Sequence, residues 1–303
     1  MLPVVESVDV SQREDLYKLH GGAVGLAGVL FLTVTGAAPI SAMLFNTPIA
    51  VGYGNGIGAP AGFLFATIIL TIFSVGYVSM ARKVTAAGGF YSFISHGLGR
   101  ELGMAAGLAS VVAYSVFEAS LCGGFAYFAV AKLNQYGHDI SWVWPALFMV
   151  ALISVLAFFD VHISARILGV ALICEVIALV IFDFVVFGNL GDGGHNVQFG
   201  AINPINAFKN LPAGSHQGTA IAAGAWAVGV FFAFWSWVGF EMAPNYGEES
   251  KNPKKIVPMA MYISVIGLGV FYVITSWAAI SGYASTEAAA TQAVNNAYGF
   301  FLD

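Results

Sequence analysis

The stretch whose residue types could bind a small molecule covers residues 231–258, FFAFWSWVGFEMAPNYGEESKNPKKIVP. It begins as an apolar run, breaks at the Ser-Trp-Val-Gly segment 236–239, and continues into a carboxylate, Glu241. An interrupted helix presents two half-helix ends, one with free backbone donors and one with free carbonyls. Two such ends can hold a zwitterion or an ion with few charged side chains, so we expect a binding site here.

A second predicted helix interruption lies near the N-terminus, in residues 33–42, TVTGAAPISA. Pro39 removes a backbone donor and clashes with the preceding turn. Taken alone, this segment is equally well interpreted as a proline kink packed on small residues. The break at 236–239 favours a broken helix over a plain proline kink, because paired interrupted helices in two halves of a chain indicate a transport site near the bilayer midplane.

The composition places both segments in a membrane. The chain has 303 residues, of which 58% are hydrophobic and 9% are charged, whereas a soluble domain carries roughly 25% charged residues. A hydrocarbon core needs about 20 apolar residues per helix. Seven stretches meet that length, and they are 22–52, 60–81, 103–131, 142–159, 165–188, 219–247 and 258–283.

Other binding chemistry is not indicated by the sequence. Cys122 and Cys174 lie inside apolar runs, where they are expected to be small buried hydrophobes. The histidines and cysteines form no grouping with metal-ligand spacing, so neither a metal nor an organic cofactor is expected. The basic residues are scattered at the ends of apolar runs, which disfavours nucleic acid as a partner.

The basic residues also predict the orientation of the chain. When loops are assigned alternately to the two sides, one side collects nine of the eleven, namely Arg13, Lys18, Arg82, Lys83, Arg100, Arg166, Lys251, Lys254 and Lys255. Cytoplasmic loops carry the excess of Lys and Arg. We therefore expect residues 1–21 to be a cytoplasmic tail and residues 189–218 an extracellular loop, which disfavours a seven-helix receptor.

Several acidic residues lie within or beside apolar runs, where a charge is costly. Glu118 and Glu175 fall near mid-depth of the third and fifth stretches, and a coupling role is as well supported as a structural hydrogen bond. Asp160 and Asp183 fall near the ends of their stretches, so we expect them to contact water.

Two motifs carry a family resemblance. The predicted cytoplasmic segment 86–93, AAGGFYSF, and the segment 235–241, WSWVGFE, followed by 248–254, EESKNPK, and Pro258, resemble signatures of the amino acid–polyamine–organocation (APC) permeases. The similarity runs from about Gly22 to the end. It implies an all-α integral membrane fold of two inverted five-helix repeats, with about twelve helices in all and with helices 1 and 6 broken.

On this resemblance, residues 22–188 form the first five-helix repeat. Residues 219–303 form an incomplete second repeat, with helices 6 and 7 and an extracellular tail, and we expect the chain to be a fragment truncated after helix 7. The resemblance implies that a substrate carboxylate meets backbone donors at the helix 1 break and that the amino group meets freed carbonyls of helices 1 and 6. The positions carried over are Ala38, Ile40, Ser41, Ala42, Phe234, Trp235, Ser236, Trp237 and Gly239.

Further roles follow from the same resemblance. Trp235 matches an aromatic residue that caps the substrate in some relatives, and Glu241 matches an acid expected to bond to another helix. The chain departs from the family where Ile40-Ser41-Ala42 replaces a Gly-Ser-Gly-like break. It departs again where Glu175 replaces a lysine of some proton-coupled relatives, although Glu175 could itself take up a proton.

We therefore expect a permease of the cell membrane that moves an amino acid or a related, polyamine-like amine by alternating access. The favoured coupling ion is H+, with Na+ as the alternative. A transporter-fold sensor that only binds its ligand and a non-transporting fragment of a permease are the competing interpretations. An intramembrane enzyme is disfavoured because no nucleophile and base share a plausible depth. The substrate and the oligomeric state stay open.

Overall fold

The computed structural model describes residues 24–84, 88–158, 161–191, 196–209, 225–297 and 299–301, without the side chains of 161–167 and 286. Within these residues the fold is helical, with one isolated bridge between Val24 and Ser250. Three predicted features lie outside the described residues. They are the tail 1–21, the first two residues of the motif 86–93, and Asp160. Six helices are long and apolar enough to cross a membrane, and a seventh apolar helix is shorter, which confirms the predicted all-α membrane fold.

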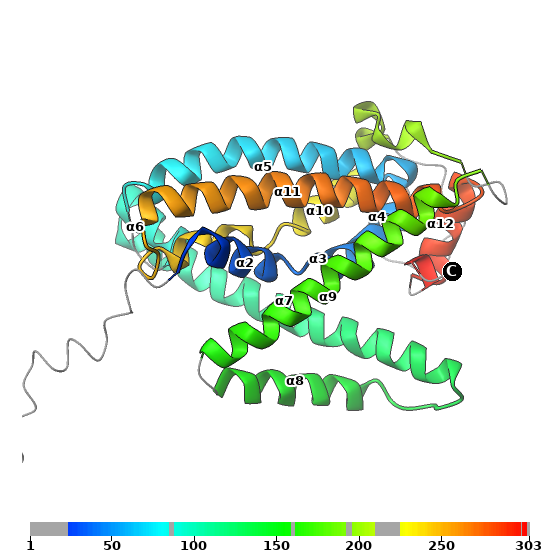
Figure 1. Ribbon diagram of the computed structural model, residues 1–303, viewed down its shortest axis with the longest axis horizontal. Helices are drawn as coiled ribbons and strands as arrows, with labels where there is room; N and C mark the ends of the chain where they lie inside the picture. Colours follow the sequence, from blue (N-terminus) through cyan, green and yellow to red (C-terminus); the bar gives the residue numbers. More distant parts are fainter. Residues whose placement is uncertain are drawn as a thin grey trace, which may run out of the picture.

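Four of the seven apolar segments form a compact bundle (Figure 1). The first segment is α2 (Leu26–Ala37), α3 (Pro39–Ser41), a π-helical turn η1 (Ala42–Asn46) and α4 (Thr47–Tyr53). The others are α5 (Ala59–Ala81), α10 (Trp226–Trp235) continued by the 3-10 helix η5 (Phe240–Tyr246), and α11 (Pro253–Ser281). We call these four segments the bundle.

The bundle is held together by large apolar side chains that the neighbouring helices bury completely. Phe63 of α5, Trp237 after α10, and Met261 and Tyr272 of α11 are each 1% exposed or less. Burying such a side chain contributes roughly 1.5–3 kcal/mol. α11 packs along both α5 and α2 and thereby joins these two segments.

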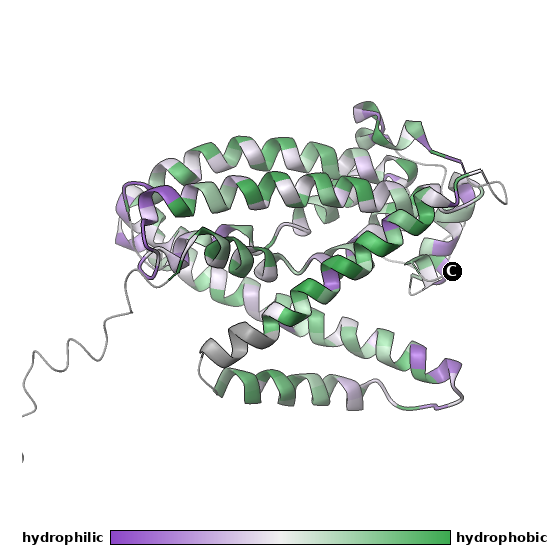
Figure 2. Cartoon of the chain, in the orientation of Figure 1, coloured by the Kyte–Doolittle hydropathy of each residue, from purple (hydrophilic) through white to green (hydrophobic). Residues whose placement is uncertain are grey.

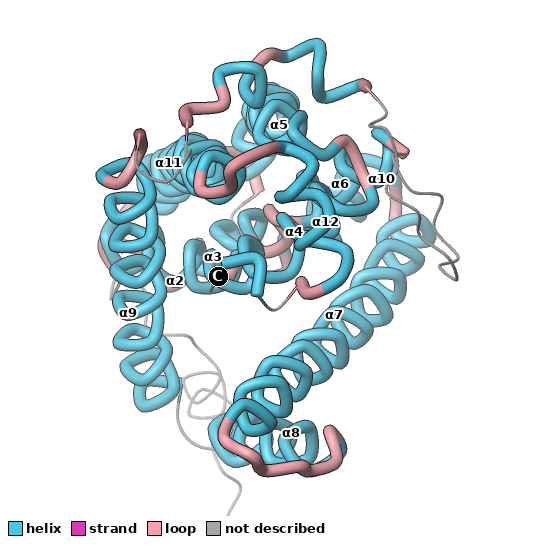
Figure 3. The backbone as a smooth tube through the Cα atoms, turned by 90° about the vertical axis from the view of Figure 1, so that its right-hand side faces the viewer, coloured by secondary structure: helices cyan, strands magenta, loops and turns pink. Residues whose placement is uncertain are grey.

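The remaining helices form a second group, which we call the arm (Figures 1 and 3). Its members are α6 (Gly89–Leu98), α7 (Arg100–Gln135), α8 (Val143–Phe158) and α9 (Val161–Gly188). α7 and α8 pair with each other, and α9 runs diagonally across the bundle, contacting α2, α3 and α11. Apolar residues cover the exposed faces of the arm, as lipid contact requires (Figure 2).

Short helices close one end of the bundle. They are η2 (Gly56–Gly58), η3 (Phe199–Ile202), η4 (Pro204–Phe208), α12 (Thr286–Asn295) and η6 (Gly299–Phe301). Asn55, only 1% exposed, ties η2 to η4, because its Nδ2 donates to the carbonyls of Gly58 and Ala207 at 2.9 and 3.1 Å.

Candidate functional site

The first apolar segment is interrupted at a single residue, Ala38. Its backbone is left-handed, with φ 43° and ψ 71°, and it is the only residue other than glycine with a positive φ in the described ranges. Such a conformation costs of the order of 1–3 kcal/mol. Pro39 then begins a new half helix whose N-terminal donors the helix itself cannot satisfy. The resemblance placed the break at residues 40–42. In the structure Ile40, Ser41 and Ala42 are helical, and the break lies before Pro39.

The interruption in the sixth segment is the one predicted. α10 ends at Trp235, residues 236–239 form successive turns, and the chain resumes at Phe240 as a 3-10 helix. Gly239 adopts φ 109°, which an L side chain rarely tolerates. At the end of α10, the carbonyls of Phe234 and Trp235 accept from the N–H groups of Trp237 and Val238 at 3.1 Å, in turns that replace the regular α-helical ladder.

The two interruptions meet in space at a pair of glycines. A Cβ built on Gly239 would lie 2.3 Å from the carbonyl oxygen of Gly36, and one on Gly36 would lie 2.9 Å from the sulfur of Met242. Only glycine allows backbones to approach this closely. The crossing therefore sets the half-helix ends beside one another.

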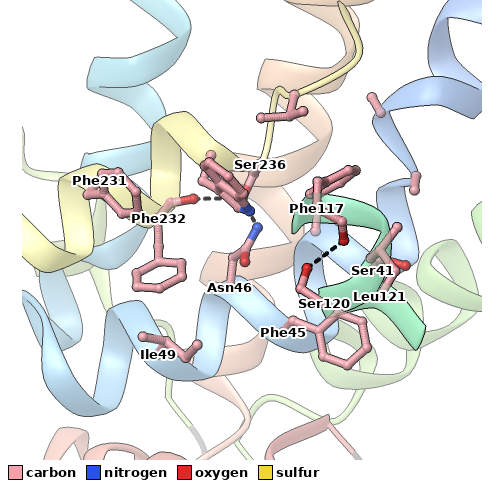
Figure 4. Close-up of a pocket in the computed structure, with 15 residues that line it drawn as sticks. Ser41, Phe45, Asn46, Ile49, Phe117, Ser120, Leu121, Phe231, Phe232 and Ser236 are labelled. Atoms are coloured by element: carbon pink, nitrogen blue, oxygen red, sulfur yellow. Dashed lines mark hydrogen bonds between the residues drawn. The ribbon is translucent and has the colours of Figure 1, made fainter. Parts of the chain in front are cut away.

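A cavity of about 390 Å³ lies next to these ends. Figure 4 shows that α7 supplies one wall and the two broken segments supply the others. The fifteen residues that line it are Ala37, Ala38, Ser41, Ala42, Phe45, Asn46, Ile49, Phe117, Ser120, Leu121, Phe231, Phe232, Trp235, Ser236 and Val238. The lining is largely apolar with a few polar groups, which is typical of a small-molecule site.

The polar groups of the cavity link its walls. Asn46 Nδ2 donates to Ser236 Oγ at 2.9 Å, and Ser236 Oγ donates in turn to the Phe232 carbonyl at 2.9 Å (Figure 4). On α7, Ser120 Oγ donates to the Phe117 carbonyl at 2.6 Å. The fifteen lining residues include no charged side chain. Charged groups of a ligand would therefore have to meet backbone donors and carbonyls.

The structure brings five of the nine predicted binding residues to the cavity wall, namely Ala38, Ser41, Ala42, Trp235 and Ser236. Trp237 instead lies in the bundle core, where its Nε1 donates to the Val265 carbonyl at 3.3 Å. Phe234 packs edge-on against Phe65 of α5. Gly239 forms the crossing, and Ile40 presents its backbone donor to α9.

Other lining residues were not predicted from the sequence. Phe45, Asn46 and Ile49 follow the first break at helical spacing, and Phe117, Ser120 and Leu121 come from α7. Asn46 carried a usable signal, since an amide within an apolar half helix needs a polar partner. The α7 residues carried none, because nothing in one sequence shows which helix lies opposite a break.

Glu241 bonds to the arm, as its match in the family suggested. Its Oε1 accepts from the hydroxyl of Tyr114 on α7, and its Oε2 accepts from the backbone N–H of Gly239 at 2.9 Å. Tyr77 of α5 donates its hydroxyl to the Glu241 carbonyl at 3.0 Å. The carboxylate therefore joins the second break to the neighbouring helix.

The other two predicted acids differ in their surroundings. Glu175 of α9 is half-buried, and its Oε2 lies 3.5 Å from the Ile40 nitrogen, at the donor end of the first break. Glu118 of α7 is exposed along a wide groove between α2, α7 and α8, and makes no hydrogen bond to another helix in the described part of the chain. Of the two, Glu175 is the one placed next to the site.

Comparison with known families decides the identity of this arrangement. The family described as "Amino acid permease" matches residues 28–303. The chain belongs to this family of transporters. It is 25% identical over 251 residues to the branched-chain amino acid permease BcaP of Lactococcus lactis, covering 78% of this chain and 51% of the relative.

Two further relatives extend the comparison. BcaP of Bacillus subtilis is 23% identical over 278 residues, which cover 86% of this permease chain and 52% of the relative. A transporter of Mycobacterium tuberculosis (strain ATCC 25618 / H37Rv), described as uncharacterized, is 23% identical over 279 residues, with 88% and 56% covered. The chain spans about half the length of the curated relatives it matches.

Proposed function

We propose that this permease chain forms the substrate-binding half of a secondary transporter that moves an amino acid across the cell membrane. The observation that carries the proposal is the cavity of about 390 Å³ walled by both broken segments. The helix N-terminus at Pro39 would attract a carboxylate and the C-terminus of α10 an ammonium group through their backbone partial charges, although the N–H of Ile40 itself lies against Glu175. A zwitterion matches that pair of ends.

The substrate class follows from the rest of the lining. Phe45, Ile49, Phe117, Leu121 and Phe232 present apolar surface, and no lining residue could pair with a charged side chain. Apolar surface removed from water contributes about 25 cal/mol per Å². We infer a neutral, apolar amino acid in preference to a polyamine. The names of the BcaP relatives, branched-chain amino acid permeases, support this choice.

Alternating access would use the division between bundle and arm. The bundle would rock against α7 and α9 around the cavity, and the Tyr114–Glu241 contact would open and close with it. The N-terminus would be cytoplasmic, and H+ would be the coupling ion, because carboxyls contact both breaks at the boundary of the two groups.

A ligand screen on the purified chain tests the binding step. Leucine, isoleucine and valine should raise the thermal midpoint, whereas lysine, glutamate and putrescine should not. A ligand at a hundred times its Kd stabilises by about 2.7 kcal/mol. Trp235→Ala should remove the shift, and Trp144→Ala, on an exposed part of α8, should retain it.

The same preparation separates transport from binding. Uptake of labelled leucine into proteoliposomes would support a transporter, and binding without uptake would support a sensor. A screen in which lysine or putrescine stabilises and leucine does not would overturn the proposed substrate class.

A further inference from the structure

A second acid of α9, Asp183, lies away from the cavity and has no role in substrate binding. It follows Glu175 by eight residues, which places it about 12 Å further along the helix. The sequence suggested a position in contact with water, but the side chain is only 8% exposed. The expectation of a solvated aspartate is therefore wrong, because α11 packs over this part of α9.

Asp183 has one polar neighbour. The hydroxyl of Thr275, on α11 and itself completely buried, lies 2.9 Å from Asp183 Oδ2. Within the described ranges, Oδ1 has no hydrogen-bond partner. An ionised carboxylate is an acceptor with about four lone-pair positions. Leaving a charged oxygen unpaired in an apolar contact is strongly unfavourable.

No cation compensates this carboxyl from the helices packed against α9. The described residues of α2, α3 and α8 include no titratable side chain. On α11, Lys254 and Lys255 lie in the first turn, about 30 Å from Thr275 along the helix. Tyr262 lies more than three turns from Thr275, and the buried hydroxyl of Tyr272, one turn before Thr275, makes no hydrogen bond within the described residues. A proton on Asp183 itself is the remaining way to remove the charge.

Thr275 suits both protonation states of this acid. A threonine hydroxyl is donor and acceptor at once. It can accept from the neutral acid while donating along its own helix, or donate to the carboxylate. The proton can therefore arrive or leave without a change of partner, but the neutral form is the one that suits the buried contact between α9 and α11.

We propose that Asp183 is a proton-binding site and that its proton holds α9 of the arm against α11 of the bundle. Loss of the proton leaves a carboxylate that must reach water, so α9 and α11 separate at this point. The link to transport rests on the proposed function, because it makes Asp183 a carrier of the coupling ion. The proton site itself does not depend on which solute is moved.

Infrared spectroscopy of the purified chain in lipid nanodiscs tests the site directly. The carbonyl absorption of a protonated carboxylic acid should be present at mildly acidic pH and vanish as the pH is raised. Asp183→Asn should remove the component that belongs to this site, whereas Asp139→Asn, at an exposed aspartate between α7 and α8, should leave it in place. An unchanged spectrum in Asp183→Asn would overturn the proposal.

Two variants of Thr275 test the site independently, in case Asp183→Asn fails to fold. Thr275→Val should move the pH at which the absorption disappears, and Thr275→Ser, which keeps the hydroxyl, should not. Identical titrations of both variants would overturn the contact. Absence of leucine binding with the absorption intact would refute the proposed function alone, while leucine binding without the absorption would refute the proton site alone.

Discussion

At the scale of single residues, Gly239 is constrained both by its backbone conformation and by the space around it. Its φ of 109° excludes most L side chains, and the carbonyl oxygen of Gly36 occupies the space that a Cβ would need, 2.3 Å away. Gly36 is limited mainly by space, since its neighbour is the flexible end of Met242. The two glycines are therefore unequal, although both stand at the crossing of the broken segments.

Gly239→Ala should destabilise the chain far more than a helical glycine substitution does. Backbone strain alone costs of the order of 1–3 kcal/mol, and the clash with Gly36 adds to it. Thermal unfolding in detergent measures the change. The matched control is Gly267→Ala on α11, where nothing lies within 4 Å of the new Cβ. The thermal midpoint of this variant should equal that of the unaltered chain or exceed it slightly, because alanine favours a helix more than glycine does. Equal midpoints for the two variants would contradict a close crossing.

Tyr114 is the residue on which the Glu241 carboxylate depends for its bond to the arm. Tyr114→Phe should lower stability by about 1–3 kcal/mol, because it leaves one acceptor oxygen of a part-buried charge without its donor. Thermal or denaturant unfolding provides the measurement. Tyr127→Phe, on the same helix with its side chain 49% exposed, serves as the control and should change nothing measurable. A neutral Tyr114→Phe would show that water replaces the hydroxyl.

The sequence predicted the chemistry of individual residues better than their direction. The break residues Ser41 and Ser236, the small residues Ala38 and Ala42, and Trp235 were carried over from the family resemblance, and the cavity lining includes them. Trp237 was expected in the site and lies in the core, since the turn at 236–239 directs consecutive side chains to opposite sides. Turn geometry decides that direction, and residue type does not reveal it.

At the scale of elements, the two half helices are tied by one buried hydrogen bond. Asn46 belongs to the π-helical turn η1, and its Nδ2 reaches Ser236 at the end of α10, at 2.9 Å. A π-helical turn holds one extra residue, which rotates the side chains that follow. The break at Ala38 and this turn together bring Asn46 to face the other segment.

A double-mutant cycle measures this tie. Asn46→Ala and Ser236→Ala should show a coupling free energy of about 0.5–1.5 kcal/mol in thermal unfolding, the usual net worth of a hydrogen bond. Asn46→Ala combined with Ser120→Ala, which lines the same cavity but bonds within α7, should be additive. Additivity in both pairs would mean that Asn46 and Ser236 do not interact in solution.

The existence of both breaks could be predicted, but their conformations could not. Gly239 and Pro39 are strong local signals of an interrupted helix. The left-handed residue turned out to be Ala38, an alanine with no intrinsic preference for that conformation. Pro39 disfavours a right-handed helical conformation for Ala38 but by itself favours an extended one, so we attribute the left-handed conformation to tertiary packing.

At the scale of the whole molecule, three polar contacts between the described residues join the bundle to the arm. They are Tyr114–Glu241, Glu175–Ile40 and Asp183–Thr275, and each involves a carboxyl group. The sequence located these acids in apolar surroundings but supplied no partner for any of them, because the partners lie between 92 and 135 residues away. Seven apolar segments were predictable by length, whereas their division into two groups was not.

The orientation of the chain can be tested by labelling with a membrane-impermeant maleimide. In a background of Cys122→Ser and Cys174→Ser, Asp139→Cys should react in intact cells and Lys83→Cys only after permeabilisation. These positions follow α7 and α5 at opposite ends of the fold (Figure 1). The expected result follows from the excess of basic residues near Lys83. The reverse pattern would place the N-terminus outside.

The glycine pair at the crossing has a consequence for the gene. Every single-nucleotide change that converts a glycine codon to another amino acid introduces a Cβ atom. At position 239 no such replacement fits, and at position 36 only a small one with a displaced Met242 could. A deep mutational scan should therefore find codon 239 almost invariant among surviving clones, codon 36 somewhat less so, and codon 267 freely variable.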